Sequence, residues 1–138
     1  MEVGMGDSVS SRPEDGGPLR IWEVERLWEL AKELPIKQIP LAILSDLDRV
    51  GWYGQPNNVG YLTLREAADH ARRIQAANLD YPIILSAEGH LLDGFHRVAK
   101  AYILGRSEIA AVQFLENPEP DRIRPLPEWL DQALRLRR

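Results

Sequence analysis

The segment Leu92 to Lys100, Leu-Asp-Gly-Phe-His-Arg-Val-Ala-Lys, gathers residue types that can bind an anion. A short apolar run leads through Asp93 and Gly94 into a helical pattern, which predicts a strand, a glycine turn and a helix start. The first backbone N–H groups of a helix lack intrahelical partners, and the helix dipole adds positive potential there. The segment therefore predicts a site for an anion, above all a phosphate group.

Three basic side chains follow this glycine. His96 and Lys100 are one helical turn apart and Arg97 lies beside them. Because basic groups at a helix start oppose the dipole, an anionic ligand would offset their repulsion. Arg97 can hold phosphate oxygens with its planar fork, and His96 can donate a hydrogen bond or move a proton near neutral pH. The expected ligand-binding residues are Gly94, Phe95, His96, Arg97 and Lys100.

Asp93 and His96 are the candidate catalytic residues. A carboxylate at Asp93 could orient or deprotonate a hydroxyl group near a bound phosphate. Structural explanations stand beside this one, because Asp93 can also cap the helix or pair with Arg97, and His96 can be a packed polar residue. The spacing of the residues leaves these interpretations open.

The other histidines do not form a metal-site pattern. His70 lies in a predicted helix beside Asp69, Arg72 and Arg73, which is typical of a solvated face, and we expect no role for it. His90 lies in a short predicted strand and could reach the same pocket or point into solvent. No pair of histidines has His-x-x-x-His spacing, so we expect no metal held wholly by protein. Mg²⁺ carried in with a nucleotide is compatible with this expectation.

The elements that must position these residues alternate along the chain. Apolar spacing predicts helices over residues 19–34, 64–77, 94–105 and 127–135, the second of them after the capping-box pair Thr63 and Glu66. Short apolar runs predict strands over residues 36–44, 82–85, 90–92 and 108–115. This order predicts an α+β (mixed α/β) domain, with a short mixed sheet flanked by helices.

Two predicted helices have apolar faces that we expect to be buried. They consist of Leu64, Ala67, Ala68, Ala71, Ile74 and Ala77 in the first, and of Val98, Ala99, Tyr102 and Ile103 in the second. Residues 45–58 form a predicted polar loop. Its Trp52 and Tyr53 could stack on a base, cap a pocket or plug a hydrophobic surface.

The composition excludes several classes of protein. The chain has 138 residues, no cysteine, and a formal net charge of −4. It therefore has no disulfide, cysteine metal ligand or cysteine nucleophile, and its charge argues against the basic surface of a non-specific duplex binder. It also lacks a long apolar span and the pattern of a secretory signal, so we expect a cytoplasmic protein without a membrane partner. Residues 1–18, rich in glycine, proline and serine, are expected to form a flexible tail, and residues 19–138 a single domain.

The stretch from Tyr81 to Phe114 resembles the ParB/sulfiredoxin superfamily. The matching residues are Pro-Ile-Ile-Leu at 82–85, Gly89, Leu-Asp-Gly-Phe-His-Arg at 92–97, Ala-Lys-Ala at 99–101, Leu-Gly at 104–105 and Ile-Ala-Ala-Val at 109–112. Residues 36–44 look like the opening strand of that domain, so the resemblance spans about residues 36–115. It implies a ParB/sulfiredoxin-like fold whose turn and helix start hold nucleotide phosphates.

The motif carries over position by position. Sulfiredoxins have Gly-Cys-His-Arg, whose His and Arg contact ATP and whose Cys does the chemistry, and partition proteins have Gly-Glu-Arg-Arg. Gly94, His96 and Arg97 match the sulfiredoxin positions, and Phe95 occupies the cysteine position. Because a phenyl ring is not a nucleophile, the resemblance implies nucleotide binding without sulfiredoxin activity. Free serine kinases resemble the segment through an Asp-Gly-His-His-Arg type of turn, in which Asp93 matches the aspartate.

The expected function is binding of a nucleotide or another phosphorylated small molecule, and the resemblance implies ATP, ADP or CTP with Mg²⁺. One alternative is an ATP- or ADP-dependent phosphotransferase that acts on a small hydroxyl compound. Another is a non-catalytic module that binds DNA or a protein. The residues after 115 are few and rich in proline, which argues against the helix-turn-helix of partition proteins and disfavours nucleic acid. The sequence is compatible with a homodimer.

Overall fold

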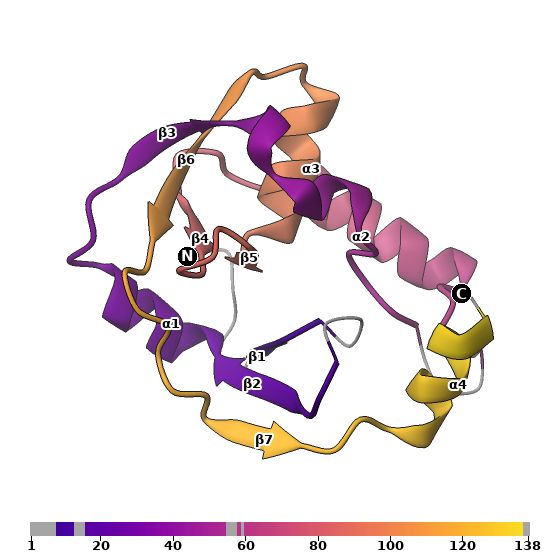
Figure 1. Ribbon diagram of the computed structural model, residues 1–138. Coiled ribbons are helices and arrows are strands. Elements are labelled where there is room, and N and C mark those ends of the chain that lie inside the picture. The colour runs from indigo at the N-terminus through magenta and orange to yellow at the C-terminus, as the bar shows by residue number, and fades with distance from the viewer. Residues whose placement is uncertain (1–7, 13–15, 55–57, 59, 137–138) are drawn as a thin grey trace.

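The computed structural model describes residues 8–12, 16–54, 58 and 60–136. Within these ranges the protein is an α+β domain with helices around two sheets, which confirms the predicted fold class (Figure 1). Its elements are β1 (Ser8–Ser10), β2 (Leu19–Glu23), α1 (Val24–Ala31), β3 (Lys37–Pro40), α2 (Leu64–Ala76), β4 (Ile83–Leu85), β5 (Leu91–Asp93), α3 (Phe95–Ile103), β6 (Glu108–Gln113), β7 (Arg122–Arg124) and α4 (Glu128–Leu136). Two 3₁₀ turns, Leu41–Ile43 and Ser45–Asp48, follow β3.

The larger sheet is mixed and has the strand order β3-β6-β4-β5. β4 runs parallel to β6, whereas β3 and β5 are antiparallel to their neighbours. Successive side chains of a strand point to opposite faces, and β4 has buried side chains on both faces of the sheet. Ile83 packs in a core cluster with Val98 and Ala101 of α3. Ile84 packs in a second cluster with Leu27 of α1. The sheet is therefore covered by α3 on one face and α1 on the other.

The smaller sheet is antiparallel, with the order β1-β2-β7, and lies at the bottom of Figure 1, with α3 at the top. It corrects two expectations. The helix predicted over residues 19–34 begins only at Val24, because residues 19–23 form β2. Ser8–Ser10, inside the expected flexible tail, form β1, while residues 1–7 and 13–15 of that tail lie outside the described ranges. Both differences arise because β2 is held between β1 and β7, and β7 lies near the other end of the chain, so local spacing does not reveal this sheet.

The start of α2 follows the prediction. Thr63 Oγ1 accepts a hydrogen bond from the Glu66 backbone N–H at 3.1 Å, and Glu66 Oε1 accepts one from the Thr63 N–H at 3.0 Å. The predicted apolar face of this helix is only partly right. Leu64 is 93% exposed, and among the described residues of α2 none is fully buried. Of the predicted face, Ile74 is half-buried and Ala77, just after the helix, is buried, and His70 is half-buried beside them.

The predicted buried face of α3 is confirmed at Val98 and wrong at its C-terminal end. Tyr102 and Ile103 are 67% and 69% exposed, whereas Arg97, Val98 and Ala101 are buried. The turn that links β5 to α3 sets the rotation of the helix about its axis, so the face that meets the sheet starts at Arg97. A buried arginine in this stripe is tolerated because it has a charged partner, as described below.

No helix in the described ranges combines the length and the apolar character needed to cross a lipid bilayer.

Candidate functional site

The predicted strand, glycine turn and helix start are all present. β5 ends at Asp93, Gly94 is the N-cap with φ 110°, and α3 begins at Phe95. A Cβ atom at Gly94 would lie 2.6 Å from Ile83 Cγ2, so both the backbone angle and the packing require glycine here. Within the described ranges no side chain caps this helix. The first-turn N–H groups of α3 therefore keep their capacity to bind an anion.

Asp93 is buried beneath the turn and pairs with Arg97. Its Oδ2 accepts hydrogen bonds from Arg97 Nη2 at 3.1 Å and from Trp28 Nε1 at 3.0 Å. The register explains the Trp28 contact, because Asp93 lies opposite Ile84 in the sheet and shares its α1-covered face. Burial raises the pKa of Asp93, and the Arg97 charge and the hydrogen bonds from Trp28, Arg97 and the Gly94 backbone only partly counteract this. Of the interpretations left open, the structure shows the ion pair rather than a helix cap.

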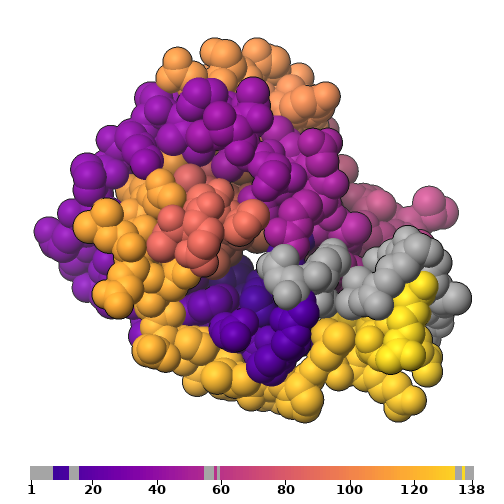
Figure 2. Space-filling view, viewed as in Figure 1, coloured from indigo at the N-terminus to yellow at the C-terminus, as the bar shows by residue number. Residues whose placement is uncertain are grey.

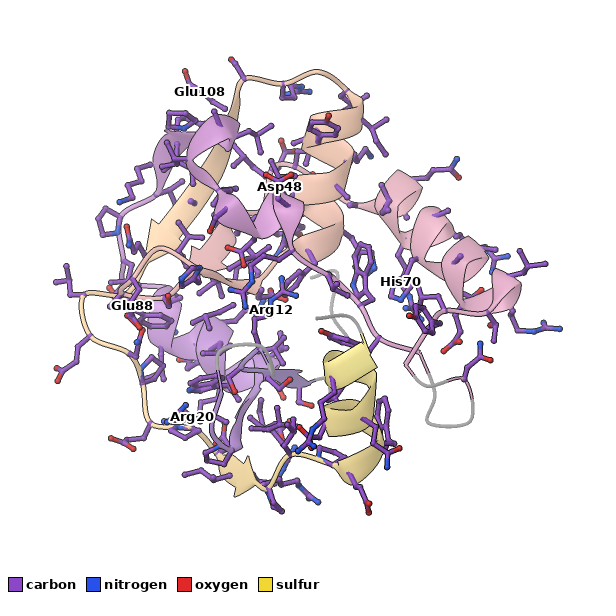
Figure 3. All side chains as sticks on the ribbon, turned by 45° about the vertical axis from the view of Figure 1, so that its right-hand side comes forward. Arg12, Arg20, Asp48, His70, Glu88 and Glu108 are labelled. Carbon is purple, nitrogen blue, oxygen red and sulfur yellow. The ribbon has the colours of Figure 1, made fainter. Side chains whose placement is uncertain are left out.

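His96 meets a residue for which the sequence predicted no role. His70 Nδ1 lies 2.9 Å from His96 Nε2, although the two residues come from different helices. Figure 3 shows His70 extending from α2 toward α3. The ring of Trp52 stacks on both, with centroids 4.3 Å from His70 and 4.8 Å from His96. The interpretation of His70 as part of a solvated face is therefore wrong. The stacking of Trp52 on two imidazoles was not among the uses suggested for it from the sequence.

The two histidines are held in their neutral forms. Burial, followed by the nearby His70, Arg73 and Arg97, lowers the pKa of His96 to about 4. Burial and the Arg73 charge also lower the pKa of His70. At neutral pH one ring therefore donates the shared hydrogen bond and the other accepts it. Protonation of His96 therefore requires a lower pH than that of an ordinary histidine.

Lys100 is directed away from the turn. Its Nζ donates hydrogen bonds to the backbone carbonyls of Gln75 at 2.9 Å and Ala77 at 2.7 Å. These carbonyls lie at the C-terminal end of α2, where a cation is favourable to the helix dipole. Lys100 thus fastens α2 to α3 instead of joining the expected ligand-binding residues.

A cavity of about 950 Å³ opens beside the turn. It is lined by the consecutive residues 93–97, by β1 and the segment after it, by His70 and Arg73 of α2, by Trp52 and by Trp129 of α4. Figure 2 shows the molecule hollowed between the indigo N-terminal strands and the orange-red residues near position 90. The charged side chains that line it within the described ranges are Arg12, Arg73, Arg97 and Asp93, which leaves an excess of positive charge.

Arg12 enters this cavity from the segment that the sequence suggested would be a flexible tail. Its side chain is 10% exposed, and its guanidinium carbon lies 4.9 Å from the centroid of the Phe95 ring. Its Nη1 donates a hydrogen bond to the Val50 carbonyl, and its Nη2 lies 3.5 Å from Asp46 Oδ1. Within the described residues, Nε and Nη2 make no hydrogen bond. No sequence pattern marks this position beyond the isolated arginine itself.

His90 lies near Asp46, the partner of Arg12, rather than at the turn before α3. Its Nδ1 lies 3.7 Å from Asp46 Oδ2, and about half of its side chain is exposed. The same aspartate oxygen accepts a hydrogen bond from the Leu91 backbone N–H at 3.0 Å. Within the described residues, no group of three or more histidine, cysteine or acidic side chains is arranged to hold a metal ion.

Comparison with known proteins adds no relative: no family model, curated protein or solved structure matches the chain.

Proposed function

We propose that the protein binds a nucleotide or another phosphorylated small molecule, with a phosphate group seated at the start of α3. The observation that carries this proposal is that residues 93–97, which include the uncapped start of α3, line a cavity with an excess of arginine. Free amide donors, the positive end of a helix dipole and arginine side chains together favour a phosphate. The ParB/sulfiredoxin resemblance of Gly94, His96 and Arg97 supports the same ligand class.

The size and the aromatic lining of the cavity support a nucleotide. Its volume of about 950 Å³ is within the usual range for small-molecule sites, about 300 to 1,000 Å³. Trp52, Tyr53 and Trp129 also line it and provide surfaces on which a base can stack. ATP, ADP and CTP, carried with Mg²⁺, are therefore the first ligands to test. Such ligands are plentiful in the cytoplasm, where we propose that the protein acts.

Calorimetric titration with ATP, ADP, CTP and inorganic phosphate tests the proposal, and two adjacent arginines of α2 provide a matched pair of variants. Arg73 lines the cavity, whereas Arg72 points outward and its side chain is 82% exposed. Arg73→Gln should weaken binding about fivefold, or roughly 1 kcal/mol, while Arg72→Gln should leave it unchanged. Absence of binding by all four compounds would refute the proposal.

A second candidate function is phosphoryl transfer from ATP or ADP to a small hydroxyl compound. The specific observation that favours it is the hydrogen bond between His70 and His96, beside the proposed phosphate position. A neutral imidazole can accept the proton of an attacking hydroxyl group, and a second imidazole can orient it. Asp93, engaged by Arg97 and Trp28, would act by holding Arg97 in place.

Product analysis separates binding from transfer. ATP or ADP is incubated with Mg²⁺ and serine-like acceptors, and transfer of phosphate to the acceptor is measured. In an enzyme, His96→Gln should abolish transfer while nucleotide still binds, because only the proton acceptor is lost. Binding without any phosphate release or transfer would leave the first proposal standing and reject this one.

A further inference from the structure

We infer that Arg12 forms a second anion-binding position beside the start of α3, and that the ligand carries a diphosphate group. This inference rests on the proposed function and extends it from one phosphate to two. The α3 amides would bind one phosphate, and the Arg12 guanidinium would bind the other. Figure 3 shows Arg12 near the centre of the molecule, where the N-terminal segment meets the rest of the domain.

The first support is the incomplete bonding of a buried arginine. A guanidinium has five N–H donors, and burial of donors without acceptors is unfavourable. The Arg12 side chain is nine-tenths buried, yet within the described residues its Nε and Nη2 make no hydrogen bond. Because the Arg12 side chain also lines the cavity, an anion bound there would supply acceptors to a guanidinium whose donor set is incomplete.

The second support is the contact with the helix start itself. The Arg12 guanidinium lies over the ring of Phe95, the first residue of α3, at 4.9 Å from its centroid. An aromatic face attracts a guanidinium and holds its plane in place. Phe95 therefore acts as a positioning residue for Arg12. This contact accounts for a phenyl ring at that position of the turn motif.

The third support is the way in which Arg12 is anchored. Asp46 balances its charge, and the Val50 carbonyl accepts from Nη1 on the same side chain. These contacts fix the side chain but occupy only part of its donor set. Asp46 does not itself line the cavity with Arg12, so the ligand would meet the arginine rather than the carboxylate.

The experiment compares inorganic phosphate with inorganic pyrophosphate by calorimetric titration of the full chain. The wild-type protein should bind pyrophosphate at least about tenfold more tightly than phosphate. Arg12→Gln should reduce this ratio to about twofold or less, with phosphate binding retained. Arg20→Gln, an exposed arginine on β2, is the matched control and should keep the wild-type ratio.

Two further variants control for misfolding and test the contact between Arg12 and the Phe95 ring. Arg12→Gln with Asp46→Asn removes both charges of the pair, so it avoids an unpaired buried carboxylate and should show the same loss. Phe95→Leu keeps an apolar side chain but removes the aromatic face, and should lower the pyrophosphate preference in part. Circular dichroism confirms that each variant is folded.

The outcomes separate the two proposals. Phosphate binding with no preference for pyrophosphate would overturn the inference and leave the proposed function intact. A preference that survives both Arg12→Gln and the double variant would overturn it too. Failure of phosphate, pyrophosphate and nucleotides alike to bind would reject the proposed function, and this inference with it.

Discussion

Two buried aspartate–arginine pairs border the cavity, and they are built differently. Asp93 and Arg97 are four residues apart across the turn into α3, and Trp28 donates a further hydrogen bond to the carboxylate. Arg12 and Asp46 come from distant parts of the chain and approach only to 3.5 Å. The first pair is compact and local, whereas the second leaves donor nitrogens of Arg12 without hydrogen bonds within the described residues.

The difference separates a structural role from a binding role. A buried ion pair that is joined by hydrogen bonds fixes the positions of its elements, and its loss is costly. A buried cation with spare donors keeps the capacity to bind something else. The Asp93–Arg97 pair therefore fastens the turn, and Arg12 is the member of the two pairs that is suited to a ligand.

The largest effect is expected for Arg97→Ala, which leaves the Asp93 carboxylate buried without its cation. The loss in unfolding free energy should be about 3 to 5 kcal/mol, measured by urea unfolding. Arg72→Ala is the control, because that side chain is 82% exposed and its ion pair with Asp69 lies at the surface. The control should change stability by less than about 0.5 kcal/mol. Equal losses of stability in the two variants would show that the Asp93–Arg97 pair contributes no more than an ion pair at the surface.

Arg12→Gln should destabilise the protein by less, about 1 to 2 kcal/mol by the same measurement. The remaining Asp46 carboxylate still accepts from the Leu91 backbone and lies near His90, so it is not left without partners. Glutamine also preserves part of the packing against Phe95. A loss as large as that of Arg97→Ala would show that the distant pair is structural too.

The histidines between α2 and α3 should make stability depend on pH. The pKa of His96 falls from 6.5 to about 4 on folding, so between these pH values the unfolded chain binds more protons than the native state. Stability should therefore decrease as pH is lowered from about 6.5 toward 4, by roughly 1 kcal/mol after allowance for solvent screening of a half-exposed ring.

Thermal unfolding at a series of pH values measures this dependence. His96→Gln should flatten the profile in that window relative to wild type. His90→Gln leaves the contact between His70 and His96 intact, so this variant should lose stability between pH 6.5 and 4 as the wild type does. A phosphate ligand should also flatten the wild-type profile, because an anion beside His96 raises its native pKa toward the unfolded value.

The smallest effect is expected for Lys100→Met. Its ammonium group binds two carbonyls at the end of α2, so the change should cost about 0.5 to 1 kcal/mol of stability. Binding of inorganic phosphate should stay within twofold of wild type. A large loss of phosphate affinity with little loss of stability would contradict the placement of Lys100 outside the site and restore the prediction made from spacing.

Local patterns predicted the parts of the fold that depend on neighbours in sequence. The capping box at Thr63, the turn at Gly94 and the α+β element order all follow from such patterns. The buried faces of α2 and α3 followed only in part, because a helix with several alternative apolar stripes is rotated by its connections and its neighbours. β2 was mistaken for part of a helix because it is held between β1 and β7, and β7 is far away in sequence.

The candidate site divides in the same way. The sequence by itself determined the helix start, its glycine and the spacing of Asp93 and Arg97, because one turn of helix fixes those distances. Only the tertiary structure decided that His70 meets His96, that Lys100 turns to α2 and that Arg12 enters the cavity. These contacts join residues tens of positions apart, and their geometry depends on how helices and sheets pack rather than on any local spacing.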